Sequence, residues 1–379
     1  MPDRVPGTQP PFTVGDLKRA IPAHCFERSL VRSFGHLAAD LAVVGALYWS
    51  TQWIDHPSVP PAMATYLLWP LYWFLQGAFQ TGLWVLAHEC GHGGFSDSEA
   101  INDSVGLVLH SALLVPYYSW KHSHRRHHSN TGSMEGDEVF VPATKSQIGA
   151  VAEALDSAPG KAVALLFTFT LGWPFYLLFN IASREYKGHT WVNHFNPYSP
   201  IFNKSERSSI VVSDLALLSF AGLLGYLGMT HGFGWLAKVY GIPYLGVNFW
   251  LVLITLLQHT DAALPHYRGD DWNWLKGALC TVDRDFGFFL NHVHHHIADT
   301  HVCHHLFSYL PFYHAQEATR ALKEVMGPYY RFDSTPIPVA LWNSLSECGY
   351  VEDEGAVTGP LWFKPISEKR KEAKAAKAA

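Results

Sequence analysis

Long apolar runs alternate with polar stretches along this chain of 379 residues. A helix needs about 20 residues to cross the hydrocarbon core of a bilayer. Four apolar runs reach that length, and they cover residues 35–54, 64–87, 209–229 and 239–258. The pattern predicts an all-α integral membrane protein in which four spanning helices form two hairpins.

Two further apolar runs, residues 102–120 and 161–182, are predicted to be interfacial or re-entrant helices. The first is shorter and contains Pro116, and the second is interrupted by Gly172 and Pro174, residue types that weaken or kink helices. The number of crossings supports this assignment, because the histidine clusters described below can share metal ions only on one side of the membrane. Three apolar runs lie between the second and third histidine clusters. If all three crossed the membrane, these two clusters would lie on opposite sides.

The distribution of positive charge predicts which side faces the cytosol. The loop 183–208 carries four Lys or Arg residues, whereas the loop 55–63 carries none. Because positive residues favour the cytosolic side, the loop 183–208 and the histidine clusters are predicted to be cytosolic. The predicted organisation is a cytosolic N-terminal segment (1–34), a membrane domain (35–363) with a histidine-rich cytosolic cap, and a Lys-rich cytosolic tail (364–379).

Composition agrees with a membrane protein. Hydrophobic residues make up 48% and charged residues 16% of the chain, whereas a soluble domain has about a quarter charged residues. The net charge of -5 argues against nucleic-acid binding as a main role. The five cysteines are scattered and odd in number, which favours a reducing compartment over a disulfide framework. The N-terminus lacks the apolar core of a signal peptide, so insertion is expected to use internal spans.

Three clusters of histidine carry the candidate chemistry. They comprise His88 and His92; His124, His127 and His128; and His301, His304 and His305. Within each cluster, spacings of three and four residues place the imidazoles on one face of a helix. Eight imidazoles exceed the four ligands of a tetrahedral zinc site, and neutral imidazole suits iron, copper, nickel and zinc. The clusters therefore predict two metal ions, each with several histidine ligands and an open position.

Two other classes of protein share parts of this pattern. The segment HECGH (88–92) matches the H-E-x-x-H motif of zinc metalloproteases, but a protease leaves the second and third clusters unexplained. A metal transporter is the other alternative, although transporters hold their ligands near the bilayer midplane, whereas these clusters flank the apolar runs. Isolated histidines such as His110 and His314 are more often packed or exposed side chains than metal ligands.

Longer segments around the clusters carry a family resemblance. They are HECGHGGFSD (88–97), WKHSHRRHHSNTGSMEGDEVFVP (120–142), LLQHTDAALPHY (256–267), GALCTVDRDFG (277–287) and HVCHHLFSYLPFYHAQEATRALK (301–323). Together they resemble the membrane-bound fatty acyl desaturases, and within that family the microsomal delta-12 branch. The resemblance extends from Pro11 to Tyr350.

This resemblance implies O2-dependent desaturation at a non-haem diiron centre. It assigns the eight clustered histidines to the metals, with His259 and His295 as candidates for an additional ligand. Nearby acids, Glu89 and Asp137 among them, are candidates to orient imidazoles. The resemblance further implies that oleoyl chains, carried on phospholipid, are converted into linoleoyl chains. Omega-3 desaturation and hydroxylation or conjugation are the alternatives within the same family.

The resemblance also implies a location and an electron source. Members of this branch lie in the endoplasmic reticulum membrane, with the active site on the cytosolic face. The chain contains no His-Pro-Gly-Gly haem-binding sequence, so a fused cytochrome b5 domain is not expected. The expected donor is a separate cytochrome b5, reduced by NADH-cytochrome b5 reductase.

Overall fold

The structure is a computed structural model that describes residues 4–378, and it is almost entirely helical. Its described residues contain one small sheet, in which β1 (Asp283–Arg284) pairs in parallel with β2 (Phe332–Asp333). The helices used below are α1 (Val14–Ala20), α2 (Leu30–Ile54), α4 (Trp69–His92), α5 (Glu99–Ala112), α6 (Tyr117–Asn130), α8 (Ala158–Phe179), α9 (Arg207–His231), α11 (Ile242–His259), α14 (His301–Leu306) and α15 (Ala315–Met326). The remaining α-helices are α3 (Pro61–Met63), α7 (Ala150–Leu155), α10 (Phe233–Leu236), α12 (Trp274–Ala278), α13 (Phe288–Val293), α16 (Ile337–Glu347) and α17 (Ile366–Ala378). The all-α prediction is confirmed.

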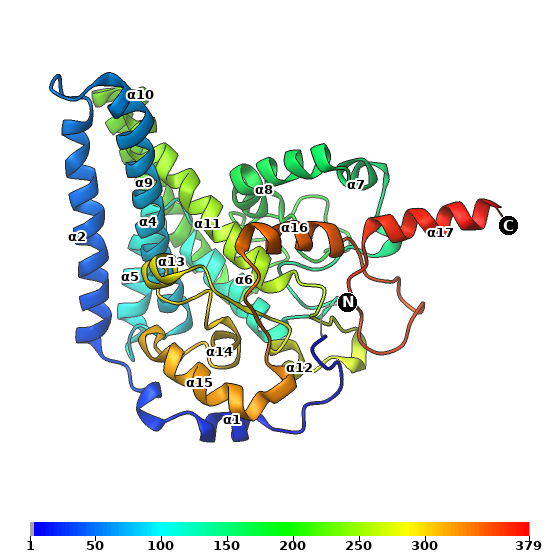
Figure 1. Ribbon diagram of the computed structural model, residues 1–379. Coiled ribbons are helices and arrows are strands. Elements are labelled where there is room, and N and C mark those ends of the chain that lie inside the picture. The colour runs from blue at the N-terminus through cyan, green and yellow to red at the C-terminus, as the bar shows by residue number, and fades with distance from the viewer. Residues whose placement is uncertain (1–3, 379) are drawn as a thin grey trace.

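The helices α2, α4, α9 and α11 rise together on one side of the molecule (Figure 1). Helix α4 packs against α2, α5 and α11 and is the most enclosed of them. Its contact with α11 depends on small residues, because a Cβ at Gly77 would lie 3.2 Å from the Cα of Gly246. This close approach fixes the position of α4, whose last turn carries His88 and His92.

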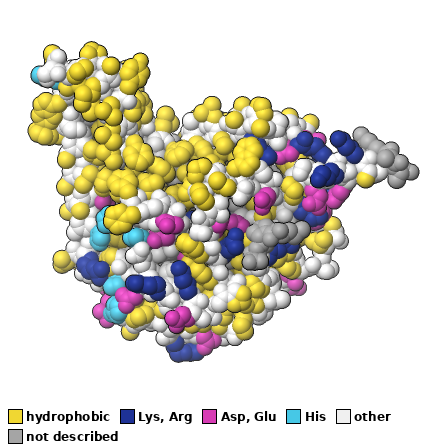
Figure 2. Space-filling view, in the orientation of Figure 1, with side chains coloured by type: hydrophobic (Ala, Val, Ile, Leu, Met, Phe, Trp, Pro, Cys, Tyr) yellow, Lys and Arg dark blue, Asp and Glu magenta, His cyan; other side chains and the backbone are white. Residues whose placement is uncertain are grey.

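Four helical segments of the described chain are long and apolar enough to cross a membrane: Leu30–Ile54, Ala158–Phe179, Lys204–His231 and Phe233–His259. The number agrees with the prediction, but the set differs from it. Three segments contain predicted spans, whereas the predicted span 64–87 is replaced by α8. Helix α4, which covers most of the predicted span 64–87, carries the buried polar side chains of Gln76 and Gln80. Figure 2 shows hydrophobic side chains covering the upper part of the molecule, with most charged side chains below.

The two runs predicted to be interfacial helices differ from the expectation in detail. Residues 102–120 do not form one helix, because Pro116 starts α6 after the turn that ends α5. Conversely, Pro174 does not interrupt α8, which continues from Ala158 to Phe179. Proline removes one backbone hydrogen bond, and an apolar helix packed on a neighbour tolerates that loss. Helix α8 lies across the direction of α2 (Figure 1), and its placement along the interface stays a prediction.

The helical cap is held together by an apolar core beneath α15. Residues Leu17 of α1 and Cys25 pack with Leu322 of α15, so the N-terminal segment lies directly against the cap. Helix α2 begins at Leu30, within the predicted N-terminal segment 1–34. At the other end of the chain, α17 is a helix whose Arg370 and Glu372 form ion pairs with Asp156 and Lys145.

Candidate metal centre

The three histidine clusters lie on three helices whose ends converge. Helix α4 ends at His92, where Gly93 adopts a left-handed conformation (φ 74°) and terminates the helix. Helix α6 carries the second cluster, and the short helix α14 carries the third. As the sequence predicts, each cluster presents its imidazoles on one helical face. Packing of α4, α6 and α14 then brings the eight side chains together.

One group of four imidazoles combines all three clusters. It contains His88, His92, His124 and His304, whose ligand atoms lie within 4.8 Å of one another. The Nε2 atoms of His88 and His304 are 2.8 Å apart. His128 adjoins this group, with its Nε2 3.1 Å from that of His124.

A second group contains His127, His259 and His305, again with ligand atoms within 4.8 Å of one another. His259 is the last residue of α11 and belongs to none of the three clusters. Its Nε2 lies 3.0 Å from the Nε2 of His301, which joins this group to the third cluster. The His128 and His305 rings stack with centroids 4.0 Å apart, so the two groups are neighbours.

The arrangement fits metal ions better than hydrogen bonds alone. Two imidazole nitrogens bound at about 2.1 Å to one ion, at right angles, lie about 3.0 Å apart. The close Nε2 pairs of both groups have this separation. Among the described residues, the buried Nε2 atoms of His92, His127 and His305 have no hydrogen-bond partner, which is costly unless a ligand is bound. The imidazoles of each group could therefore hold a metal ion.

Electrostatics keeps these imidazoles in the form that binds metal. Burial, followed by the charge of neighbouring imidazoles, holds the pKa of His124 and of His305 well below the usual range. Burial also lowers the pKa of His304, to about 3. These rings are consequently neutral near pH 7, with a lone pair available to an ion.

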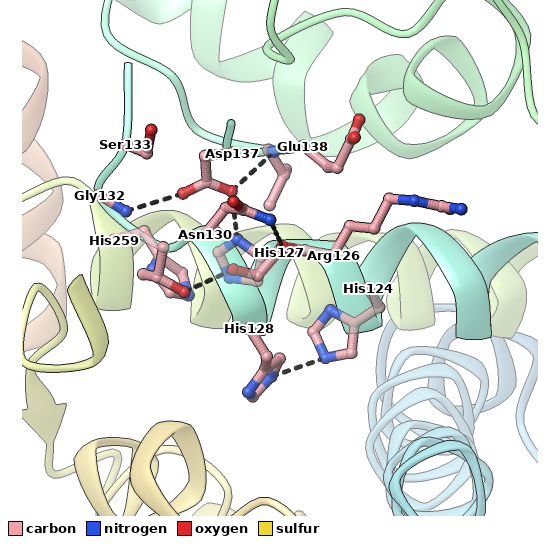
Figure 3. A network of polar contacts seen from close by, with 12 residues as sticks. His124, Arg126, His127, His128, Asn130, Gly132, Ser133, Asp137, Glu138 and His259 are labelled. Carbon is pink, nitrogen blue, oxygen red and sulfur yellow. Dashed lines mark hydrogen bonds and ion pairs between the residues drawn. The ribbon is translucent and has the colours of Figure 1, made fainter. Parts of the chain in front are cut away.

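Of the acids near the clusters, Asp137 makes the most direct contact. Its Oδ1 lies 2.6 Å from Nδ1 of His127, and its Oδ2 accepts a hydrogen bond from the Gly132 backbone N–H at 3.0 Å (Figure 3). This contact leaves Nε2 of His127 directed to the centre. Glu89 is buried, with Oε1 3.6 Å from Nδ1 of His304.

The other nearby acids serve different partners. Glu138 pairs with Arg184 and Tyr186. Asp283 accepts a hydrogen bond from the Val302 N–H and so supports the start of α14.

The structure separates the two candidates for an additional ligand. His259 lies inside the second group, whereas His295 belongs to neither group. The Nε2 of His295 lies 2.7 Å from Oδ2 of Asp40 on α2, an ion-pairing arrangement within the protein interior. In the sequence, His259 could be recognised as a candidate ligand because it directly follows the predicted span 239–258.

An apolar cavity of about 290 Å³ reaches both groups, and its lining residues could not be predicted because they come from segments far apart in the chain. Its walls come from α4, α6, α8 and α11, with side chains such as Trp84, Trp173 and Leu251. His88, His124, His127, His259 and His301 lie on its inner surface. Gly172 and Thr168 of α8 also line it. A slender apolar ligand would therefore meet the imidazoles inside this cavity.

The fold and site define a multi-pass membrane protein with a buried polyhistidine centre at the end of an apolar cavity. Residues 65–336 match the family model described as fatty acid desaturase, and the chain belongs to that family. The chain therefore belongs to a family of desaturases rather than to the zinc proteases or the metal transporters. The cavity and the family together mark it as an enzyme acting on fatty acyl chains in a lipid bilayer.

Curated relatives align over nearly the whole chain. The chain is 52% identical to a Delta(12) fatty acid desaturase FAD2 of Calendula officinalis, covering 95% of this chain and 93% of the relative. It is 52% identical to a Delta(12)-oleate desaturase of Trichosanthes kirilowii, covering 96% and 98%. It is also 51% identical to an Oleoyl-12-hydroxylase FAH12 of Ricinus communis, covering 95% and 92%.

Proposed function

We propose that this protein is an O2-dependent delta-12 desaturase that converts oleoyl chains, carried on phospholipid, into linoleoyl chains. The observation that carries the proposal is an apolar cavity that ends on both histidine groups. An unactivated C–H pair offers no acidic proton for a side-chain base, so the reaction needs a redox centre. The delta-12 relatives support the position of the new bond.

The proposed cofactor is a non-haem diiron centre. His88, His92, His124 and His304, with His128, would hold one iron, and His127, His259 and His305, with His301, the other. We assign the additional ligand to His259 rather than to His295. When bound, iron supplies the O2 chemistry that breaks strong C–H bonds, which redox-inactive zinc does not.

The protein's own side chains would select and position the substrate. The indoles of Trp84, Trp120 and Trp173 line the cavity and exclude water from the reacting carbons. An acyl chain has no polar handle near its midpoint, so the shape of the cavity must fix which carbons face the imidazoles. An existing cis double bond bends the acyl chain. A cavity of matching shape would hold the bend in one place and so fix which carbons, at a set distance from it, face the imidazoles.

Identity alone does not separate desaturation from hydroxylation, because the hydroxylase relative is as similar as the desaturases. Expression in a host that makes oleate but no linoleate, followed by fatty-acid analysis, distinguishes them. We expect linoleate from oleate, detectable use of palmitoleate and almost none of stearate. The preference for oleate over stearate is expected to correspond to a free-energy difference on the order of one to a few kcal/mol, as for other small differences between substrates in an apolar pocket. Ricinoleate or alpha-linolenate as the main product would contradict the delta-12 assignment.

The proposed electron donor is a separate cytochrome b5, reduced by NADH-cytochrome b5 reductase. We further propose the endoplasmic reticulum membrane as the location, with the metal centre on the cytosolic face. One relative, 53% identical, is an omega-6 fatty acid desaturase named as an endoplasmic reticulum isozyme of Glycine max. The Lys and Arg residues of the loop 183–208 support the cytosolic orientation.

Glycosylation tests this topology. An acceptor sequence on a short inserted loop beside Lys187 should remain unmodified, because the proposed topology keeps this loop in the cytosol. The same insertion beside Ser58, in the loop 55–63, should be glycosylated and serves as the matched control. The measurement is the shift in electrophoretic mobility that a glycosidase reverses. Modification beside Lys187 would show that α8 crosses the membrane.

A further inference from the structure

Four other side chains of types that can bind a metal lie between the N-terminal segment and the cap. None of them belongs to the histidine centre. His24 and Cys25 come from the short 3-10 helix η1 (Ala23–Phe26), His314 ends the 3-10 helix η7 (Phe312–His314), and Glu317 lies in the first turn of α15. Each offers one ligand atom, and these four atoms lie within 4.8 Å of one another. Residues almost 300 positions apart in sequence therefore meet here.

The separations within this cluster approach those of a tetrahedral site. In a zinc site with ordinary bond lengths, neighbouring ligand atoms lie about 3.4 to 3.6 Å apart. His24 Nε2 is 3.0 Å from Glu317 Oε2 and 3.7 Å from Cys25 Sγ. His314 Nδ1 is 4.0 Å from the same carboxylate oxygen. The His24–Glu317 separation is shorter than this range and the His314–Glu317 separation is longer, so the side chains would have to rearrange to complete the tetrahedron.

The chemical types of the four side chains are those that zinc prefers. A thiolate, two imidazoles and a carboxylate make a neutral complex with a divalent ion, because two negative ligands balance its charge. Cys25 is buried, while the His24 and Glu317 side chains are 53% and 41% exposed, which leaves an entry path. Burial, followed by the charge of Glu317, raises the pKa of the Cys25 thiol to about 11. The bound ion must displace this proton, so affinity should rise with pH.

We propose that His24, Cys25, His314 and Glu317 bind a zinc ion that fastens the N-terminal segment to α15. The site would tie the residues before α2 to the helix that follows the third histidine cluster. It is independent of the proposed delta-12 activity, which uses other residues. Zinc here would have a structural role, since all four positions around the ion are occupied by protein.

Arg32 occupies the position next to this site. Its Nη1 lies 3.0 Å from Nε2 of His314, and its guanidinium lies over the Tyr313 ring, 4.1 Å from the centroid. When Nε2 accepts this hydrogen bond, Nδ1 carries the proton and cannot bind an ion. Metal binding therefore requires the guanidinium to withdraw from His314. Removing the competing charge in Arg32→Gln should tighten metal binding severalfold.

Cobalt titration of the purified, iron-loaded full-length protein tests the proposal. A thiolate bound to Co²⁺ gives a near-ultraviolet charge-transfer band, and the histidine centre contains no sulfur ligand. We expect this band to saturate at one added equivalent of Co²⁺ and to disappear when one equivalent of Zn²⁺ is added. Cys25→Ser and Glu317→Gln should lose the band at that concentration. Cys348→Ser, which changes a cysteine outside the cluster, should keep it.

The exposed Glu317 makes the result interpretable, because Glu317→Gln removes a ligand without opening a cavity. Iron content and desaturase activity, measured in parallel, report whether each variant is folded. A wild-type protein that shows no band at equimolar Co²⁺ would overturn the proposal. A band that depends on Cys25 and persists unchanged in both Glu317→Gln and His314→Ala would also overturn it, since it would reflect a lone thiol.

Discussion

Replacing His259 by Ala is expected to abolish desaturation and to lower the iron content from about two ions per chain toward one. The reason is geometric: His259 shares the second group with His127 and His305, and its Nε2 lies 3.0 Å from that of His301. The imidazoles around the vacated position, those of His127, His301 and His305, already belong to the same site, so no additional ligand replaces the lost one. Iron analysis of the purified protein and fatty-acid analysis of expressing cells measure the two effects.

His295→Gln is the matched control for this experiment. Glutamine keeps an N–H donor for Asp40, whose carboxylate would otherwise be left buried without its partner. We expect wild-type iron content and substantial activity. If His295→Gln lost iron while His259→Ala retained it, the assignment of the additional ligand would be reversed. Equal membrane insertion of both variants shows that the comparison concerns the metal and not folding.

The local features of the fold could be predicted from sequence because they depend on short-range patterns. The apolar runs predicted the long helices α2, α9 and α11, whose outer faces expose hydrophobic side chains. The behaviour of proline was less predictable. Pro116 begins a helix, whereas Pro174 lies within one, and the difference depends on the packing of α8 against α11. Such packing is a tertiary property that the local sequence does not contain.

The candidate site likewise combines features that the local sequence predicts with features that depend on tertiary packing. Helical spacing correctly predicted that His124, His127 and His128 share a face, but it could not predict how the clusters combine. The first group takes members from all three clusters, and the second includes His259 from the end of α11. These combinations follow from the crossing of α4, α6 and α14, which places side chains from distant segments around common points.

The role of Asp137 is the second prediction with a large expected effect. Asp137→Asn should lower activity or iron affinity by about 10- to 100-fold, as is typical when the partner of a metal-binding histidine is changed. The carboxylate accepts from Nδ1–H of His127 and from the Gly132 N–H, so it fixes both the tautomer and the orientation of the ring. An amide at this position can present its N–H₂ to Nδ1 instead, which favours the tautomer that carries the proton on Nε2.

The measurement combines competition with an iron chelator and turnover on oleoyl substrate. Glu135→Gln is the control, because Glu135 lies in the same loop, is 53% exposed and pairs with Arg268 rather than with a histidine. We expect this control to keep both iron affinity and activity. Weakened iron binding in Asp137→Asn, with normal insertion, would separate an effect on the ligand from a loss of folding. Wild-type affinity and turnover in Asp137→Asn would show that the 2.6 Å contact does not set the properties of His127.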